Sequence, residues 1–387
     1  HCGFKNLWGP PQFKPRWRPW QMCLQNSVEP IAGFPQEYVD WAFKDYLQQI
    51  MYYIDEGCVD LTDVRPLTDH EVVNGIDGVK FIDAMKPKTS VGFPLSQRKS
   101  MYLSETESGR ELDEMFFIQA DRMEDYYLDG KRAYPVFKAS LKDEPTKLTK
   151  DKVRVFQAAP IALQIILRRY FLPICRVIST HPQIFECAVG LNSHSREWNN
   201  LVKYINRFGG DRVVAGDFKS YDLKMSPEFI LLSFEVFIAI AKKAGYSKKS
   251  LRIMENVPTD IAFPTMDFNG ELIQLYGSNP SGQNLTVYTN SIVNSLYHRC
   301  ALYHIYGGKT PFNEVMSLMT YGDDCKGSVS RFFPKFNHST ISATFKRFDI
   351  DYTMAEKDME SQPYVCHYEA PFLKRWDVWN RDLGVWQ

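Results

Sequence analysis

The fold is decided by residues 315–329, which read VMSLMTYGDDCKGSV. Apolar residues flank Gly322-Asp323-Asp324 on both sides, and a glycine followed by an aspartate is a signal for a tight turn between two strands. The pattern predicts strands at 315–321 and 325–329, joined as a hairpin with two carboxylates at its tip. Taken alone, such a sequence is most often an ordinary type I′ turn with a solvated pair of acids, so its meaning depends on the rest of the chain.

The segments around the hairpin predict an antiparallel sheet with helices on one face, an α+β layer. The run RVVAG at 212–216 is typical of a strand. Ser226-Pro227-Glu228 has the capping serine, the first-turn proline and the acid that begin a helix, and Gly245 ends it. The remaining periodicities predict helices at 37–55, 161–178, 282–306 and 339–348 and a strand at 349–354. By contrast, residues 1–36 are rich in proline and aromatic residues and predict an extended arm.

Three carboxylates are expected to converge at one end of this sheet. Asp217 follows the RVVAG strand, and Asp323 and Asp324 lie in the hairpin turn. If the two elements are neighbours, the acids repel one another, and divalent cations relieve that repulsion. Such oxygen ligands suit Mg²⁺, which takes one or two carboxylates plus substrate phosphates. Two ions about 3.5–4 Å apart can activate an attacking hydroxyl and stabilise a leaving pyrophosphate.

Composition narrows the classes of protein that the chain could be. Its 387 residues exceed what a single hydrophobic core usually holds. The formal net charge is zero, so binding of nucleic acid would depend on local basic stretches such as 131–154. No pair of the eight cysteines has C-x-x-C spacing, and H-E-x-x-H is absent, which disfavours disulfide frameworks and zinc sites. No stretch predicts a transmembrane helix or a signal peptide.

Three segments resemble motifs A, B and C of the RNA-dependent RNA polymerases of picornavirus-like viruses. DFKSYD at 217–222 has two aspartates five positions apart, as in motif A. PSG at 280–282 is followed by Thr286 and Asn290, five and nine positions after Ser281, as in motif B. YGDD at 321–324 is similar to motif C. Leu285 stands where many members of this family have glycine, and it would stiffen the motif B loop.

Four further segments complete the set in the order of that family. They resemble motif G (TSVGFP, 89–94), motif F (KDE, 142–144, with Lys152 and Arg154), motif D (AEK, 355–357) and motif E (FLKR, 372–375). The resemblance implies a right-hand polymerase with an antiparallel-sheet palm backed by helices and a mixed α/β fingers region. It also implies a product of a viral polyprotein within the Picornavirales, with marine algal viruses or dicistroviruses as near relatives.

The resemblance further implies domain boundaries. We expect fingers at 1–174, including the N-terminal arm and motifs G and F, and palm at 175–262. A fingers insertion is expected at 263–278, followed by palm at 279–372. Residues 373–387 would be the end of motif E and the start of a truncated thumb.

Roles for the acidic and basic motif residues follow from the same resemblance. Asp217 and Asp323 would bridge two Mg²⁺ ions, for which Mn²⁺ would substitute. Asp324 would support the second ion, and the backbone carbonyl of Phe218 would add a ligand. Lys357 would protonate the leaving pyrophosphate as a general acid; the alternative is an ordinary surface lysine.

The remaining motif residues are expected to bind nucleotide and RNA. Asp222 and Asn290 would recognise the ribose 2′-hydroxyl, with Ser281 and Thr286 orienting Asp222 and the loop. The alternative for these residues is helix capping. The triphosphate of the incoming nucleotide would be held by Arg154, Lys152 and Lys142, whose alternative is a solvated basic loop. The expected RNA contacts are Ser90 and Gly92 of motif G and Lys374 and Arg375 of motif E.

The predicted function is two-metal-ion transfer of ribonucleoside triphosphates onto an RNA 3′ end during replication of a positive-strand RNA virus. The expected partners are RNA template and primer, a protein primer and other viral replication proteins. The expected location is the host cytoplasm, at membrane-associated replication complexes. Two alternatives are disfavoured. A reverse transcriptase would carry a bulky ring where Asp222 stands, and a non-catalytic RNA-binding scaffold would have lost a metal-binding acid.

Overall fold

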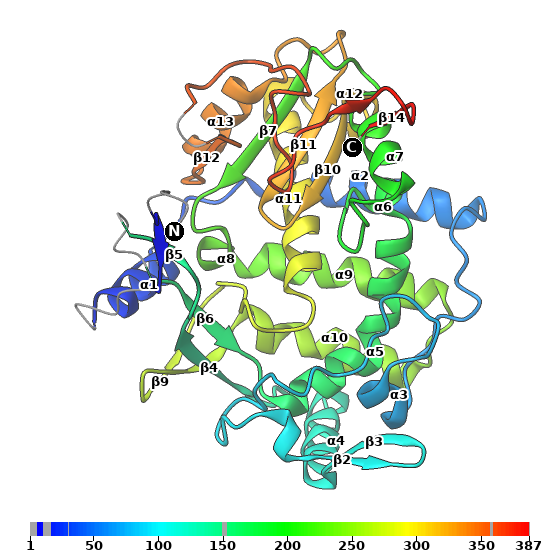
Figure 1. Ribbon diagram of the computed structural model, residues 1–387, viewed down its shortest axis with the longest axis vertical. Helices are drawn as coiled ribbons and strands as arrows, with labels where there is room; N and C mark the ends of the chain where they lie inside the picture. Colours follow the sequence, from blue (N-terminus) through cyan, green and yellow to red (C-terminus); the bar gives the residue numbers. More distant parts are fainter. Residues whose placement is uncertain (1–5, 11–16, 30, 149–152, 357–358, 387) are drawn as a thin grey trace.

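A computed structural model describes residues 6–10, 17–29, 31–148, 153–356 and 359–386. Its upper part in Figure 1 is a four-stranded sheet in the order β10-β11-β7-β12. The neighbouring strands in this sheet are antiparallel, as predicted. Their bounds are β7 Val213–Phe218, β10 Met316–Tyr321, β11 Asp324–Val329 and β12 Tyr352–Met354.

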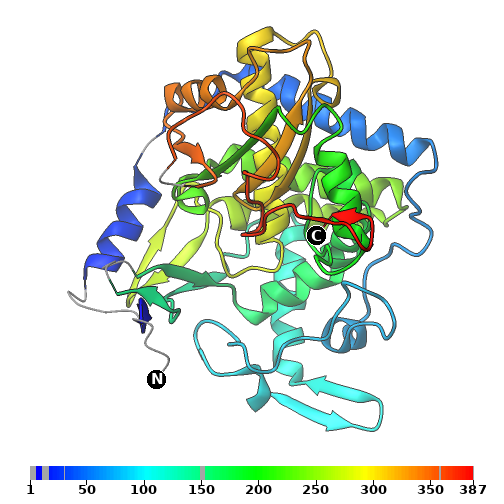
Figure 2. The ribbon, with the colours of Figure 1, turned by 45° about the horizontal axis from the view of Figure 1, so that its top comes forward.

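Both faces of this sheet are covered, although the pattern of the sequence predicted helices on one. On one face, α11 (Thr286–Tyr306) and α13 (His338–Arg347) pack through rings, and His298 meets Phe345 at 5.5 Å. On the other face, α7 (Arg196–Ile205) buries Trp198 against Met319. The C-terminal segment also crosses the sheet, as the red part of the chain shows in Figure 2. The candidate acids lie at one end of the two central strands of this sheet, and the sheet is covered on both faces.

A second, mixed sheet lies below the first in Figure 1, in the order β6-β4-β8-β9. It is formed by β4 (Val136–Leu141), β6 (Val155–Ala158), β8 (Thr265–Phe268) and β9 (Glu271–Gln274). β4 and β8 are parallel, so the segment 263–278 joins strands that precede it by more than a hundred residues. The division into fingers, palm and thumb stays a prediction.

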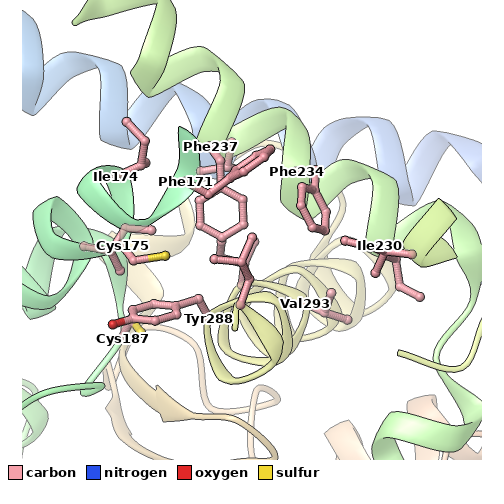
Figure 3. Packing of buried hydrophobic residues seen from close by; sticks show 14 of the residues in the cluster. Phe171, Ile174, Cys175, Cys187, Ile230, Phe234, Phe237, Tyr288 and Val293 are labelled. Carbon is pink, nitrogen blue, oxygen red and sulfur yellow. The ribbon is translucent and has the colours of Figure 1, made fainter. Parts of the chain in front are cut away.

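A helical core connects the two sheets. Figure 3 shows α5 (Ile161–Thr180), α9 (Pro227–Lys243) and α11 meeting there. Phe171 of α5 makes edge contacts with Phe234 and Phe237 of α9, at 5.4 and 6.0 Å. Edge-to-face pairs of this kind add to the stabilisation that burial provides. The predicted serine cap of α9 is present, because the Ser226 side chain accepts from the Phe229 N–H.

The prediction of an extended N-terminal arm is wrong for residues 18–28, which form helix α1 (Arg18–Val28). Pro19 lies in the first turn, where a missing N–H costs nothing and the fixed φ favours a helix. Trp20 of α1 packs edge-on against Phe268 of β8 at 5.0 Å. The remaining elements are α2 (Gln36–Asp55), α3 (Asp69–Asn74), η1 (Lys99–Met101), α4 (Glu114–Leu128), α6 (Pro182–Phe185), α8 (Tyr221–Lys224), α10 (Lys248–Ala262), α12 (Phe312–Val315), β1 (Trp8–Gly9), β2 (Leu103–Thr106), β3 (Gly109–Leu112), β5 (Thr146–Lys147), β13 (Trp379–Asn380) and β14 (Val385–Trp386).

A buried ion cluster ties α2 to α11 and to the hairpin. The Arg299 guanidinium donates to both oxygens of Glu186, at 2.7 and 2.8 Å, and to Asp45 of α2 at 2.8 Å. Both Arg299 and Glu186 are fully buried. The carbonyl of Glu186 accepts from the N–H of Thr320, one residue before the YGDD segment, at 2.9 Å. The cluster therefore supports the strand that carries the candidate acids.

Replacing Glu186 by alanine should destabilise the protein by about 3–5 kcal/mol, because it leaves the Arg299 charge buried without its main partner. Urea denaturation followed by circular dichroism measures the change. The control is Asp211→Ala, which removes an exposed pair with Arg331 and should cost about 0–1 kcal/mol. A loss below about 1 kcal/mol for Glu186→Ala would contradict a structural role for the cluster.

Candidate active site

The hairpin turn between β10 and β11 places Asp323 at one end of the four-stranded sheet. Tyr321 pairs with Asp324, so Gly322 and Asp323 are the two central residues of the turn. Gly322 has φ +66°, whereas Asp323 is not among the residues with positive φ. A type I′ turn needs positive φ at both positions, so the turn is not of that type, and glycine in first place matches type II′.

The neighbouring strand β7 brings Asp217 to the same end of the sheet. Gly216 of β7 lies opposite Cys325, and the register continues to place Asp217 beside Asp324. Residues two apart on a strand share a face, so Asp217 lies on the face of Ala215, away from α11. The predicted convergence of the three acids at one end of the sheet therefore agrees with the register.

The electrostatics of Asp323 and Asp324 show that the carboxylates are crowded. Burial raises the pKa of Asp323 to about 6, with further increases from the charges of Asp217 and Asp222. Burial also raises the pKa of Asp324 to about 7, and the charges of Asp217 and Asp323 act in the same direction. Groups whose pKa is raised by burial and like charge together are candidates for a functional site. A bound divalent cation would reverse both effects.

Asp324 is joined to the C-terminal segment by a hydrogen bond. Its Oδ2 accepts from the backbone N–H of Leu373 at 2.7 Å. Within the part of the chain that the structure describes, no three His, Cys, Asp or Glu side chains are arranged as a ready-made metal site. The acids fit a site in which Asp217 and Asp323 bind Mg²⁺ and substrate phosphates complete the shell. In such a site, Asp324 would support the second ion, as the resemblance predicts.

Helix α11 holds the hairpin turn through two residues that the sequence motifs did not predict to be part of the site. The Ser291 hydroxyl accepts from the Gly322 N–H at 2.9 Å. The Asn294 amide donates to the Gly322 carbonyl at 3.0 Å. Both side chains are buried. The available signal was a pair of polar residues, one and four positions after Asn290, on a helix that is buried along most of its length.

The predicted ribose-binding pair is in contact. The Asn290 amide donates to Asp222 Oδ1. Asn279, which the sequence did not indicate, donates to Asn290 Oδ1 at 2.8 Å and fixes the orientation of that amide. Burial raises the pKa of Asp222, and the hydrogen bond from Asn290 opposes that increase. Asp222 does not cap the following helix, because Ser226 does.

Ser281 and Thr286 hold the motif B loop and make no hydrogen bond to Asp222 among the described contacts. The Ser281 N–H and hydroxyl both donate to Gln157 Oε1 of β6, at 3.1 and 3.2 Å. The Thr286 hydroxyl donates to the Pro280 carbonyl at 2.9 Å. Gln157 was not predicted, since nothing in its local sequence distinguishes it from any strand residue.

The motif F cations share a carboxylate. Arg154 makes two hydrogen bonds to Glu144, at 2.6 and 2.8 Å, and Lys142 lies 3.2 Å from the same side chain. These bonds, with Arg154 the larger cause, lower the pKa of Glu144 to about 2. The Arg154 guanidinium also interacts with the charges of Asp222 and Asp323, so it lies near the acids. Lys152 of motif F and Lys357 of motif D lie outside the described residues.

Of the two predicted RNA-binding segments, motif E contacts Asp324, and motif G packs against Ala159 and Pro160. In motif G, the Ser90 hydroxyl accepts from the Gly92 N–H at 2.9 Å. Gly92 has φ +81°, and a Cβ there would lie 2.8 Å from the Ala159 carbonyl oxygen, so only glycine fits. In motif E, Lys374 and Arg375 are exposed and follow directly after Leu373, the partner of Asp324.

The sequence and the fold are similar to those of known proteins. The family model for viral RNA-dependent RNA polymerase matches residues 44–381. The replicase polyprotein of Cricket paralysis virus is 29% identical over 267 residues, covering 64% of this chain and 15% of that protein. The replicase polyprotein of Drosophila C virus is 27% identical over 342 residues, covering 80% and 19%. The genome polyprotein of Deformed wing virus is 24% identical over 380 residues, covering 92% and 13%.

A solved structure shares the fold. The Sicinivirus 3Dpol RNA dependent RNA polymerase superposes with a TM-score of 0.78 at 19% identity, over 98% of this chain and 77% of that chain. The three polyproteins are far longer than this chain, which spans 13–19% of their lengths.

Replacing Asp324 by asparagine should stabilise the protein at pH 8 by several degrees in melting temperature. The pKa of this acid is raised from 3.8 to about 7, so the folded state binds more protons than the unfolded state between about pH 4 and 7. Wild-type stability therefore falls as pH rises through that window. Asparagine removes the charge and keeps an acceptor for Leu373.

Thermal melts in EDTA at pH 5 and pH 8 measure the effect. The difference between variant and wild type should be small at pH 5, where Asp324 is protonated. Exposed Asp63→Asn is the control and should change neither melt. Equal differences at both pH values would contradict a carboxylate that is destabilised by partial burial and by neighbouring charges.

Proposed function

The chain belongs to the family of viral RNA-dependent RNA polymerases, and we propose that it catalyses the RNA-templated addition of ribonucleotides to an RNA 3′ end. The resemblance to picornavirus-like polymerases and the right-hand α+β fold are confirmed. A finer placement among marine algal viruses or dicistroviruses stays a prediction. The observation that carries the proposal is the crowded pair Asp217 and Asp323 beside the contact between Asp222 and Asn290.

Divalent ions are general for this family, and the acids of this chain suit them. Asp217 and Asp323 would hold two Mg²⁺ ions, for which Mn²⁺ would substitute, with the Phe218 carbonyl as a further ligand. When bound, such ions lower the pKa of the attacking hydroxyl and stabilise charge on the leaving pyrophosphate. Asp324 would keep its bond to Leu373 and would lie next to the residues that hold the ions, where its charge would offset theirs.

At the α-phosphorus the reaction forms one bond and breaks one, and the attacking hydroxyl loses its proton. The 3′-hydroxyl oxygen of the primer bonds to the α-phosphorus of the nucleotide, the bridging oxygen between the α- and β-phosphorus leaves with pyrophosphate, and the hydroxyl proton passes to solvent. Lys357 would return a proton to the pyrophosphate. Arg154 and Lys142, released from Glu144, would hold the triphosphate with charge-assisted hydrogen bonds.

Selection of ribonucleotides would come from Asp222 and Asn290. The Asn290 amide is oriented by Asn279 and is bonded to Asp222, so the pair offers donor and acceptor groups in fixed directions. A site that pairs a hydroxyl rejects a substrate lacking it, because buried polar groups are then left unpaired. Ser281 and Thr286 would position the loop beneath the nucleotide through Gln157 and Pro280.

The RNA strands would run past motifs G and E. Ser90 and Gly92 would contact template, and Lys374 and Arg375 the primer. A protein primer and other viral replication proteins are proposed partners, at membrane-associated complexes in the host cytoplasm. No helix among the described residues is long and apolar enough to cross a membrane.

Primer extension on a short RNA template with Mg²⁺ and ribonucleotides tests the proposal. Asp323→Asn should lower the rate at least about a hundred-fold, because it removes several kcal/mol of charge stabilisation at the reacting centre. Exposed Asp63→Asn is the matched control. The comparison is made in this chain and in a longer natural product that contains it. Extension by Asp323→Asn at the wild-type rate, or none by any folded wild-type form, would contradict the proposal.

Asn290→Ala should lower the preference for ribonucleotides over deoxyribonucleotides, measured as the ratio of kcat/KM values, by at least about ten-fold. The loss should come from the ribonucleotide, whose 2′-hydroxyl loses a partner. The control Asn256→Ala removes an amide that bonds a carbonyl of its own helix. An unchanged ratio in an active Asn290→Ala enzyme would show that the ribose is recognised elsewhere.

A further inference from the structure

Strand β11 is joined to the C-terminal segment at two points on one face. At the first point, Asp324 Oδ2 accepts from the Leu373 N–H at 2.7 Å. At the second point, Lys326 Nζ donates to Asp377 Oδ2 at 2.7 Å and to the His367 carbonyl at 2.8 Å. Residues 324 and 326 share a face because they are two apart on a strand. Figure 2 shows this red segment lying across the strands.

The second junction is fully enclosed. The side chains of Lys326 and Asp377 are 0% and 2% exposed. His367 Nδ1 lies 3.2 Å from the same Asp377 oxygen, so three groups meet there. A buried ion pair is weak evidence for stability, since apolar side chains of similar volume often stabilise a core as well or better. The pair does fix the position of the C-terminal segment on β11, because its hydrogen bonds are directional.

The turn at residues 372–375, which contains Leu373, needs support from the residues on both sides of it. Phe372 and Arg375 exchange two backbone hydrogen bonds, at 2.9 and 3.0 Å. The central residues Leu373 and Lys374 have φ +55° and +59°, a conformation that side chains other than glycine rarely adopt. Such a conformation persists where the surroundings over-determine it. Phe372 is anchored beside Met319 and Trp198 on one side, and Asp377 is anchored by Lys326 on the other.

We propose that Lys326 and Asp377 are positioning residues that clasp the 372–375 turn to the acid-bearing strand. The clasp keeps the Leu373 N–H on Asp324 and holds Lys374 and Arg375 at a fixed distance from Asp217 and Asp323. The metal site and the primer-side turn are thereby joined as one rigid unit. Neither clasp residue touches substrate, because both are buried. This inference rests on the proposed polymerase function.

The test compares wild type with Asp377→Asn and with the double variant Lys326→Met, Asp377→Leu. The double variant replaces the ion pair by apolar groups of similar size and should stay folded. Asp260→Asn is the matched control, because Asp260 is another buried carboxylate paired with a cation, Arg132, and it lies on α10. Each protein is measured by thermal melting, by hydrogen exchange at the Leu373 amide, and by the Mg²⁺ concentration that gives half-maximal primer extension.

The clasp predicts that the folded double variant exchanges the Leu373 amide at least about ten-fold faster and needs at least about five-fold more Mg²⁺. Asp377→Asn should shift both readouts in the same direction, whereas Asp260→Asn should lower the melting temperature and shift neither. Wild-type exchange and Mg²⁺ dependence in the double variant would overturn the inference. If only Asp377→Asn folds, a change confined to its melting temperature would also overturn it. The exchange readout needs no catalysis, so it tests the clasp even if wild type fails to extend a primer.

Discussion

Carboxylates crowded together at one end of a sheet are the constraint on which the rest of this structure depends. Burial and like charge both oppose the ionised state, as the raised pKa values of Asp323 and Asp324 show. Such a group stays in place because other parts of the chain hold it. The hairpin turn is held by Ser291 and Asn294 of α11, and Asp324 is held by the backbone of Leu373. Stability is thus given up locally at the acids, as is common at functional sites.

The supports come from segments far apart in the sequence. Glu186 binds the strand before the turn and is itself held by Arg299 of α11, which also bonds Asp45 of α2. Gln157 of the second sheet holds the motif B loop. The acids, the contact between Asp222 and Asn290, and the 372–375 turn therefore share one framework, in which the helices that form the core also carry the contacts to the site. A rigid framework of this kind suits a reaction that depends on positioning.

Local patterns predicted much of the fold and the identity of the acids. The hairpin, the RVVAG strand and the capped helix α9 follow from short-range rules, and the antiparallel pairing of β7 with β11 agrees with them. Contacts between distant segments were not predictable in this way. Gln157, Asn279 and Lys326 have ordinary local sequences, and their partners lie 124, 11 and 51 residues away. The bond of Asp324 to a backbone N–H could not be predicted either, because nearly every residue has a backbone N–H whatever its side chain.

The most direct measurement is anomalous X-ray scattering from Mn²⁺ in crystals of the protein with primer, template and a non-hydrolysable ribonucleotide. We expect Mn²⁺ peaks between Asp217 and Asp323, with phosphate oxygens completing the coordination and Asp324 still bonded to the Leu373 N–H. Peaks bound by Asp324 in place of Asp217, or an ordered nucleotide with no Mn²⁺ near any of these acids, would contradict the assignment of Asp217 and Asp323 as the metal site.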